Sequence, residues 1–272
     1  RPVVLDAHDS IAAVTATMAH TDSRRGMRAL WRFEHRKARS AERAAARSTA
    51  AVTVPSDDEA ALFERFGARV VVVPNGVAAG EVPHSTPPRS RSVVFVGYFQ
   101  WRPNVEAALE LIDEVMPRIR ATMPEAAVRV VGKDPTEELL ARRGPAVEVT
   151  GGVDDVLPHL RAARVTVLPI RAGGGTRLKA LEALAAGVPV VATRFAVGGL
   201  GLRDGEHVLL AERPADLAAQ ALRVLDDDAL ADRLSHAGRT LVEQRFDWPQ
   251  VARPLVELHH ELADRSRLGS RA

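Results

Sequence analysis

The feature that most constrains the fold is a regular alternation of short β-branched runs and helical stretches that begins at Ser92. Six mostly apolar runs are candidate strands, at 93–96, 128–131, 147–150, 165–168, 188–192 and 208–210. Helical patterns fill the intervals, at 104–120, 136–142, 155–163, 176–186 and 214–225. Strands that are apolar throughout are buried on both faces, and this alternation is typical of a parallel sheet covered by helices. The sequence therefore predicts an α/β fold with right-handed crossovers.

The region before Ser92 is organised differently. It holds one long helical segment rich in Arg and Ala, and three candidate strands, at 2–6, 51–54 and 70–73. A complete doubly wound domain needs roughly 100 to 150 residues, so we expect residues 1–75 to be the remnant of a Rossmann-like domain. Turn-forming residues indicate a linker at 76–91. Residues 92–247 are then the second domain, and the helical residues 248–272 are expected to pack back toward the N-terminal part.

Composition excludes several kinds of chemistry. The chain has 272 residues, 46% of them apolar, which is enough to bury real cores, and no apolar run approaches the roughly 18 residues that span a bilayer. The absence of cysteine excludes disulfides, thiolate metal sites and a cysteine nucleophile, and it fits a reducing cytoplasm. The histidines show no metal-ligand spacing. A net charge of only +2 and few aromatic side chains argue against a nucleic-acid partner.

Positive charge is nevertheless concentrated in the segment from Arg24 to Arg47. Its cationic residues are Arg24, Arg25, Arg28, Arg32, Arg36, Lys37, Arg39, Arg43 and Arg47. Several of them follow a four-residue spacing, so one face of the predicted helix is strongly cationic. Two interpretations remain open. The face is either a solvated helix surface with partners such as Glu34 and Glu42, or a docking surface for an anionic membrane or a lipid-linked substrate.

The segment most informative for function is a glycine-rich turn, Gly173-Gly174-Gly175-Thr176, between a candidate strand and a candidate helix. Glycines let the backbone approach a ligand closely, and the free amides of the following helix attract phosphate. Arg177 and Lys179 add positive charge. A P-loop needs glycine directly before its lysine, but Leu178 stands there, and the dinucleotide-binding pattern fails at the same residue. A structural turn without a ligand is the alternative.

Together these segments resemble the retaining glycosyltransferases of family 4, the glycosyl transferases group 1 domain, which have the GT-B fold. The subgroup that it resembles carries Gly-Gly-Gly-Thr-Arg-Leu-Lys before a nucleotide-binding glutamate. The match continues in order through 3–9, 73–77, 95–97, 101–104, 131–132, 150–153, 187–193 and 204–207. The resemblance implies transfer of a sugar, with retention, from a nucleoside diphosphate sugar to a glycan, a lipid-linked acceptor or a small molecule. It implies no metal and no other cofactor.

The resemblance also assigns roles to residues. Glu182 would accept hydrogen bonds from the ribose hydroxyls of the donor, because a carboxylate offers two acceptor oxygens to a vicinal diol. His8 would reach the donor sugar, and Gly152 and Val153 would hold the base through their main chain. The alternatives are a solvated Glu182 paired with Lys179, a histidine in a polar strand-end turn, and ordinary turn glycines.

The remaining candidates lie at strand ends, where open α/β sheets bind ligands. They are Gly97, Gly132 and Lys133. Many relatives have a glutamate where this chain has Gly174, and an arginine where it has Tyr98. We expect backbone amides to act at the first position, and Arg102, with Arg177 and Lys179, to replace the missing charge. The expected catalytic set is His8, Arg177, Lys179 and Glu182, with the cations stabilising the leaving diphosphate.

The incomplete first domain leaves a second interpretation, in which the chain is a truncated donor-binding module that binds nucleotide without efficient transfer. A GT-B-shaped sugar-nucleotide epimerase is a third interpretation, which the transferase-like segments disfavour. The expected location is the cytoplasm, with association at the inner face of the membrane if the cationic helix is a docking surface.

Overall fold

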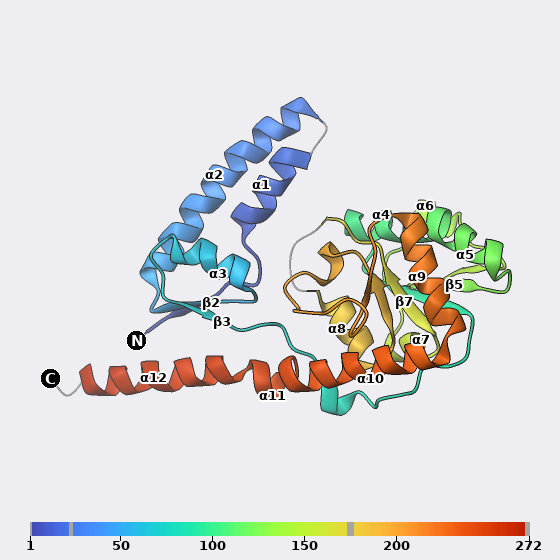
Figure 1. Cartoon of the computed structure of the whole chain (residues 1–272). Coiled ribbons are helices and arrows are strands. Elements are labelled where there is room, and N and C mark those ends of the chain that lie inside the picture. Colours follow the sequence, from blue (N-terminus) through green and yellow to red (C-terminus); the bar gives the residue numbers. More distant parts are fainter. Residues whose placement is uncertain (1, 22–23, 173–176, 270–272) are drawn as a thin grey trace. The chain divides into compact units, whose positions relative to one another are not determined.

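The computed structural model describes residues 2–21, 24–172 and 177–269. The chain forms two compact units (Figure 1). Of the described residues, 2–21, 24–75 and 248–269 belong to unit 1, and 76–172 and 177–247 belong to unit 2. Each unit has a parallel sheet with helices against it, so the predicted α/β class is confirmed.

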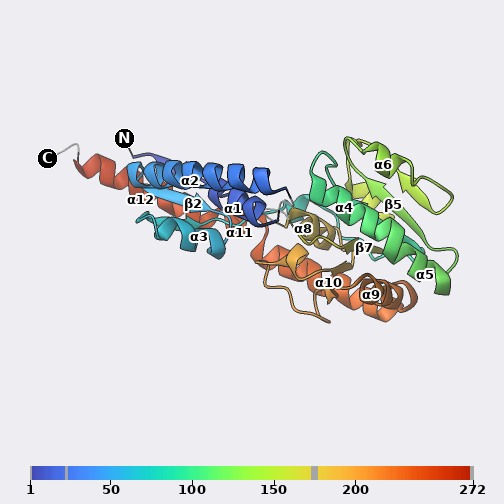
Figure 2. The same cartoon turned by 90° about the horizontal axis from the view of Figure 1, so that it is seen from above.

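Unit 1 is built on a three-stranded parallel sheet in the order β1-β2-β3. The strands are β1 (Val4–Asp6), β2 (Ala51–Val54) and β3 (Val70–Val72). The predicted long helix rich in Arg and Ala is α2 (Arg25–Ser48), and two further helices, α1 (Ile11–Thr21) and α3 (Asp57–Glu64), also connect the strands. Side-chain caps explain where these two helices begin. The Ser10 hydroxyl accepts a hydrogen bond from the Ala13 amide before α1, and the Ser56 hydroxyl accepts one from the Glu59 amide before α3. In Figure 2, α1 and α2 run side by side.

Both faces of this small sheet are covered because its side chains alternate. On one face Val52 and Val54 pack with Phe63 of α3. On the other face Ala51 packs with Leu258 and its neighbour Leu262. These leucines belong to α12 (Arg253–Gly269), which follows the short helix α11 (Trp248–Val251) and lies on the opposite side of the strands from α2 and α3 (Figure 1).

Unit 2 contains a six-stranded parallel sheet in the order β6-β5-β4-β7-β8-β9. The strands are β4 (Ser92–Val96), β5 (Ala127–Val131), β6 (Val147–Val149), β7 (Val165–Leu168), β8 (Val190–Ala192) and β9 (Leu209–Leu210). Each candidate strand of the sequence is present, within two residues at either end. The run at 188–192 begins later than expected because Gly187, with φ of +77°, and Val188 still close the preceding helix.

Helices connect and cover these strands. They are α4 (Arg102–Glu110), α5 (Met116–Thr122), α6 (Glu137–Leu140), α7 (Leu157–Arg161), α8 (Leu178–Ala185), α9 (Pro214–Asp226) and α10 (Asp228–Arg245). The segment η2 (Leu111–Val115) joins α4 to α5 through one π-helical turn, and η1 (Ala79–Glu81) and η3 (Phe195–Val197) are single 3₁₀ turns. Helix α8 packs closely on α10, since a Cβ atom on Gly238 would lie 2.5 Å from Leu184.

A buried arginine ties the 76–91 segment to the body of unit 2. The side chain of Arg164 is 2% exposed and forms an ion pair with Asp228 of α10. Its guanidinium also donates to the carbonyls of Val224, Pro87 and Pro88 at 3.1 to 3.3 Å. Because a buried charge is stable only when its donors are satisfied, these bonds fix the segment against the sheet.

Candidate functional site

The carboxyl ends of the unit 2 strands form the candidate site. The chain order runs outward from β4 through β5 to β6, and outward from β7 through β8 to β9. The direction therefore reverses between β4 and β7, and open α/β sheets bind ligands in the crevice at such a point. The residues that follow β4, β5, β6 and β7 are the segments that contain the predicted site residues.

The first two predicted glycines, Gly97 and Gly132, lie against each other. The Gly97 amide donates to the Val131 carbonyl at 2.9 Å, and a Cβ atom on Gly132 would lie 1.6 Å from the Gly97 carbonyl oxygen. Gly132 also has φ of +148°, a conformation that favours glycine. Packing between the ends of β4 and β5 therefore requires at least Gly132, and a contact of either glycine with a ligand stays a prediction.

The ends of β5 and β6 bring Lys133, Gly152 and Val153 together. The Gly132 amide donates to the Gly151 carbonyl at 3.1 Å, which joins the two loops. The Lys133 side chain passes Gly152 so closely that a Cβ atom there would lie 3.2 Å from the lysine Cγ. Lys133 and Gly152 are exposed, whereas Val153 is half-buried against the core. The exposed main chain at Gly152 fits the predicted contact with a base, which stays a prediction.

Arg102 is placed differently from the other predicted cations. It begins α4, and its side chain is 62% exposed. Its guanidinium forms ion pairs with Glu106 at 3.0 Å and with Glu138 at 3.2 Å, and the hydrogen bond to Glu106 is the main cause of a raised arginine pKa. These two carboxylates offset the charge of Arg102 in the free protein, and its contact with a diphosphate stays a prediction.

The glycine turn itself, from Gly173 to Thr176, lies outside the described residues. The chain is described again from Arg177, whose guanidinium stacks 4.3 Å from the centre of the Phe195 ring. A cation held on an aromatic face keeps its charge and loses freedom of movement. Arg177 directly precedes α8, so this charge is fixed at the N-terminal end of the helix that follows the turn.

Lys179 and Glu182 lie three residues apart on α8, so they share one face of the helix. Both side chains are half-buried. Burial lowers the pKa of Lys179 and raises the pKa of Glu182, and the charge of each residue partly offsets the shift of the other. Among the described residues, none donates a hydrogen bond to the Glu182 carboxylate. The face therefore holds a desolvated cation and a desolvated acceptor just beyond the glycine turn.

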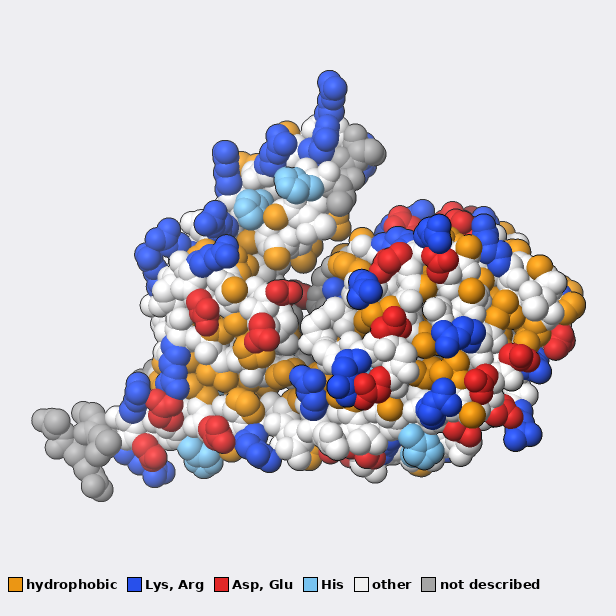
Figure 3. Space-filling model, in the orientation of Figure 1, with side chains coloured by type: hydrophobic (Ala, Val, Ile, Leu, Met, Phe, Trp, Pro, Cys, Tyr) orange, Lys and Arg blue, Asp and Glu red, His pale blue; other side chains and the backbone are white. Residues whose placement is uncertain are grey.

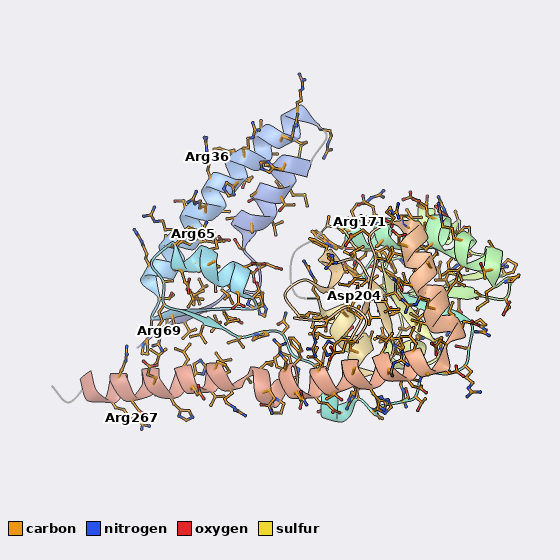
Figure 4. The ribbon with its side chains drawn as sticks, in the orientation of Figure 1. Arg36, Arg65, Arg69, Arg171, Asp204 and Arg267 are labelled. Carbon is orange, nitrogen blue, oxygen red and sulfur yellow. The ribbon has the colours of Figure 1, made fainter. Side chains whose placement is uncertain are left out.

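An ion network at the exit of β7 was not predicted from the sequence. Arg171 reaches Glu110 of α4 at 2.6 Å and Glu212, which follows β9, at 3.6 Å. Glu212 in turn accepts from the Arg194 amide at 3.0 Å. Figure 4 labels Arg171 at this edge of unit 2. The network joins the segments after β7, β8 and β9 to α4, directly before the glycine turn; its only sequence signal is an arginine at a strand end.

His8 belongs to unit 1, where it follows β1. Its Nε2 atom lies 3.2 Å from the Asp6 carboxylate, and both side chains are largely exposed. The same carboxylate accepts a hydrogen bond from the Thr53 hydroxyl at 2.7 Å. His8 is therefore oriented at the carboxyl end of the unit 1 sheet, and its contact with a donor sugar stays a prediction.

Two stretches of the chain match known families. Residues 1–80 match Glycosyltransferase Family 4, and residues 90–227 match Glycosyl transferases group 1. The second stretch covers half of the chain, including all six strands of unit 2. The chain belongs to the glycosyl transferases group 1 family. Every residue predicted to bind the donor, apart from His8, lies within that matched stretch.

Two kinds of curated relative illustrate the family. The phosphatidyl-myo-inositol mannosyltransferase of Mycobacterium leprae is 28% identical over 213 residues, which are 74% of this chain and 56% of that protein. The glycogen synthase of Mycobacterium tuberculosis is 31% identical over 219 residues, which are 75% of this chain and 51% of that protein. The chain thus spans about half the length of the curated relatives it matches.

Solved structures share the fold. Sucrose-phosphate synthase from Thermosynechococcus elongatus matches with a TM-score of 0.71 at 24% identity, over 96% of this chain and 68% of that chain. Anabaena HepE in complex with UDP and glucose matches with a TM-score of 0.72 at 16% identity, over 96% and 72%. These neighbours are GT-B glycosyltransferases, so the predicted GT-B fold is confirmed.

Proposed function

We propose that this glycosyltransferase binds a nucleoside diphosphate sugar at the carboxyl edge of the unit 2 sheet and transfers the sugar to an acceptor with retention. Membership of the family supports the transfer. The strand reversal between β4 and β7 supports the place of binding. The solved structure of HepE contains UDP and glucose, which supports a nucleotide-sugar donor for a chain of the same fold.

The single observation that carries the donor site is the state of Glu182. Its carboxylate is half-buried, burial raises its pKa, and among the described residues it receives no hydrogen bond. An acceptor that has lost water without gaining a partner destabilises the free protein, and a ligand with hydroxyl donors removes that cost. The vicinal hydroxyls of a ribose match its two oxygens.

The cations near Glu182 bind the diphosphate of the donor, whereas Glu182 binds the ribose. Arg177, fixed on the Phe195 ring, and Lys179, on the face of Glu182, hold positive charge beside the glycine turn. A diphosphate bound there gains two charge-assisted partners. The same charges stabilise the negative charge that develops on the diphosphate as it leaves the sugar, and this stabilisation lowers the barrier to transfer.

The proposal predicts selective binding of nucleoside diphosphates. Calorimetric titration with UDP, GDP, ADP and dTDP should find at least one that binds with a Kd near or below 1 mM, the weak end of ordinary affinities (about −4 kcal/mol). With the matching sugar donor in the α configuration, proton NMR should show an α-linked product. If none of the four nucleotides binds, the donor site is wrong, and a β-linked product would contradict retention.

A lipid-linked or membrane-borne acceptor is supported by the cationic face of α2. Six arginines of this helix, at 25, 32, 36, 39, 43 and 47, fall within a sector of roughly 80° when 100° is allowed per residue. Figure 3 shows Lys and Arg side chains gathered along α2, and Figure 4 shows Arg36 on its outer side. Next to this sector, the apolar Phe33 is 58% exposed, and Leu30, farther round the helix, is 47% exposed. Cationic residues beside exposed apolar ones suit an anionic lipid surface. No helix in the described ranges is both long and apolar enough to cross a membrane.

Charge removal on α2 tests this surface. The triple change Arg36→Gln, Arg39→Gln and Arg43→Gln should lower the partition onto anionic phospholipid vesicles on the order of 100-fold, at about 1 kcal/mol for each cation near the surface. Cosedimentation measures the partition, with neutral vesicles as a second arm. The matched control removes Arg118, Arg213 and Arg223 of unit 2, which are also exposed. An equal loss in the control would show that net charge alone acts.

A further inference from the structure

We propose that unit 2 has a second anion-binding site, apart from the donor site, which takes a small phosphate-bearing ligand. A cavity of about 870 Å³ lies between α10 and the loop that leads into β9. This volume is typical of small-molecule sites, which range over roughly 300 to 1,000 Å³. None of the residues assigned to the donor site lines this cavity.

The charges that line the cavity are mostly positive. Three guanidinium groups, those of Arg203, Arg233 and Arg245, face one carboxylate, that of Glu206. Glu206 already forms an ion pair with Arg203. Within the described ranges, neither Arg233 nor Arg245 has a carboxylate within 4.0 Å, whereas Arg102, Arg142 and Arg171 elsewhere in unit 2 each have at least one. The cavity therefore keeps a positive charge that its own residues do not neutralise.

The nearest other acid of the loop does not change this balance. Asp204, labelled in Figure 4, lies between Arg203 and Glu206 in the sequence but does not line the cavity. Its carboxylate accepts a hydrogen bond from the Leu210 amide at 2.9 Å, which holds the turn that enters β9. Asp204 thus has a structural partner of its own.

The loop is shaped to receive Arg245. Gly201 has φ of +64°, and a Cβ atom on it would lie 2.9 Å from Nη1 of Arg245. Glycine at this position therefore lets the guanidinium lie against the loop, where its position is set from one side by backbone. The same guanidinium also lies 5.6 Å from the centre of the Phe246 ring. A guanidinium confined in this way loses less freedom when it binds an anion.

A buried histidine supplies a neutral donor beside these cations. His207 is 6% exposed, and its Nδ1 accepts a hydrogen bond from the Arg203 amide at 3.1 Å. This bond leaves the proton of the neutral ring on Nε2, which lies 3.5 Å from Glu206. Burial is the largest cause that lowers the pKa of His207, and the charges of Arg203 and Arg245 lower it further, while Glu206 opposes them.

The chemistry of the lining favours phosphate over other anions. Guanidinium groups present planar pairs of N–H donors that match phosphate oxygens, and a dianionic phosphate interacts with more than one of them at once. The cavity is large enough for a phosphate joined to a second small group. We therefore assign it a small organic phosphate or a diphosphate, with inorganic pyrophosphate as the simplest test molecule.

Pyrophosphate titration by calorimetry tests this assignment, since the parent protein should bind two equivalents, one at each site. The double variant Arg233→Gln and Arg245→Gln should lose one equivalent, with at least about tenfold weaker binding, because two charge-assisted partners are removed. The double variant Arg177→Met and Lys179→Met should lose the other. The control Arg118→Gln and Arg223→Gln removes the same charge from exposed positions and should keep both.

The outcomes separate this inference from the donor site. Loss of one equivalent only in the Arg233/Arg245 variant, with unchanged thermal unfolding and unchanged nucleoside diphosphate binding, supports the second site. A parent that binds a single equivalent, removed by the Arg177/Lys179 change alone, overturns it and leaves the donor site intact. An equal effect of the control pair also overturns it, because the binding would then depend only on net charge.

Discussion

Glu182→Ala is expected to weaken binding of the preferred nucleoside diphosphate by about 1 to 3 kcal/mol, a factor of roughly 5 to 150, without unfolding unit 2. The reason is the loss of charge-assisted hydrogen bonds from the ribose hydroxyls to a carboxylate that lacks other donors among the described residues. Calorimetry gives the affinity, and circular dichroism confirms the fold. Unchanged affinity in a folded variant would make Glu182 a structural residue paired with Lys179.

The same side chain should destabilise the free protein. Burial raises the pKa of Glu182, so folding disfavours its ionised form. A group with a raised pKa contributes stability that is fully present below its unfolded pKa and is lost as the pH rises through its folded pKa. Glu182→Gln should therefore increase the free energy of unfolding at neutral pH, and the difference should shrink at about pH 4 and below.

Urea unfolding of parent and Glu182→Gln at the two pH values measures this difference. The sign of this difference in free energy of unfolding shows whether burial or the attraction of Lys179 dominates, because Lys179 attracts the carboxylate and opposes the effect of burial. A variant that is less stable than the parent at neutral pH would show that the attraction wins and that Glu182 serves the fold. We expect Glu182→Gln to be more stable than the parent and to bind nucleotide more weakly, as is typical of a residue that serves binding at a cost in stability.

Gly132→Ala is expected to destabilise unit 2 by about 4 kcal/mol or more, the range of exceptional single changes. The new Cβ atom would lie 1.6 Å from the Gly97 carbonyl oxygen and 2.8 Å from its carbon, so backbone and not a flexible side chain must move. The alanine would also have to adopt φ of +148°. Because the ends of β4 and β5 carry the proposed site, nucleotide binding should fall with stability.

The matched control for this change is Gly151→Ala. Gly151 lies in the adjoining loop with φ of +85°, but nothing is within 4 Å of a Cβ atom there. Only the backbone conformation is disfavoured, at about 1 to 2 kcal/mol. Urea unfolding of both variants separates the two causes. Equal midpoints would contradict the close approach of β4 and β5 as the reason for glycine at 132.

Much of the unit 2 fold could be predicted from the sequence because its strands are buried on both faces. Short, continuous β-branched runs such as Val165–Leu168 favour a buried strand over a helix, and this strand has the predicted bounds. Helix starts in unit 1 were harder, since they depend on caps. Glu42 accepts from the Ser10 hydroxyl and the Ala12 amide across 30 or more residues, and no local pattern reveals such a bond.

The site was predictable where chemistry depends on neighbours in the sequence. Glu182 and Lys179 share a helix face, so their proximity follows from spacing. Ion pairs between segments that are distant in the sequence could not be predicted in this way. Arg102 is neutralised in part by Glu138, 36 residues away, and Arg171 by Glu110, 61 residues away. Arg233 and Arg245 of the second cavity stand out because no carboxylate of the described residues lies within 4.0 Å of them. This can be recognised only from the three-dimensional structure.

The central claim, that Glu182 receives the ribose of a nucleoside diphosphate, is tested most directly by a cycle of two changes. Calorimetry compares the preferred nucleoside diphosphate with its 2′,3′-dideoxy form, in the parent and in Glu182→Ala. Removal of the hydroxyls should weaken binding to the parent by about 1 to 3 kcal/mol and should have little further effect on the variant, because both changes remove one interaction. Equal losses in parent and variant would contradict the claim, because the hydroxyls and Glu182 would then act independently.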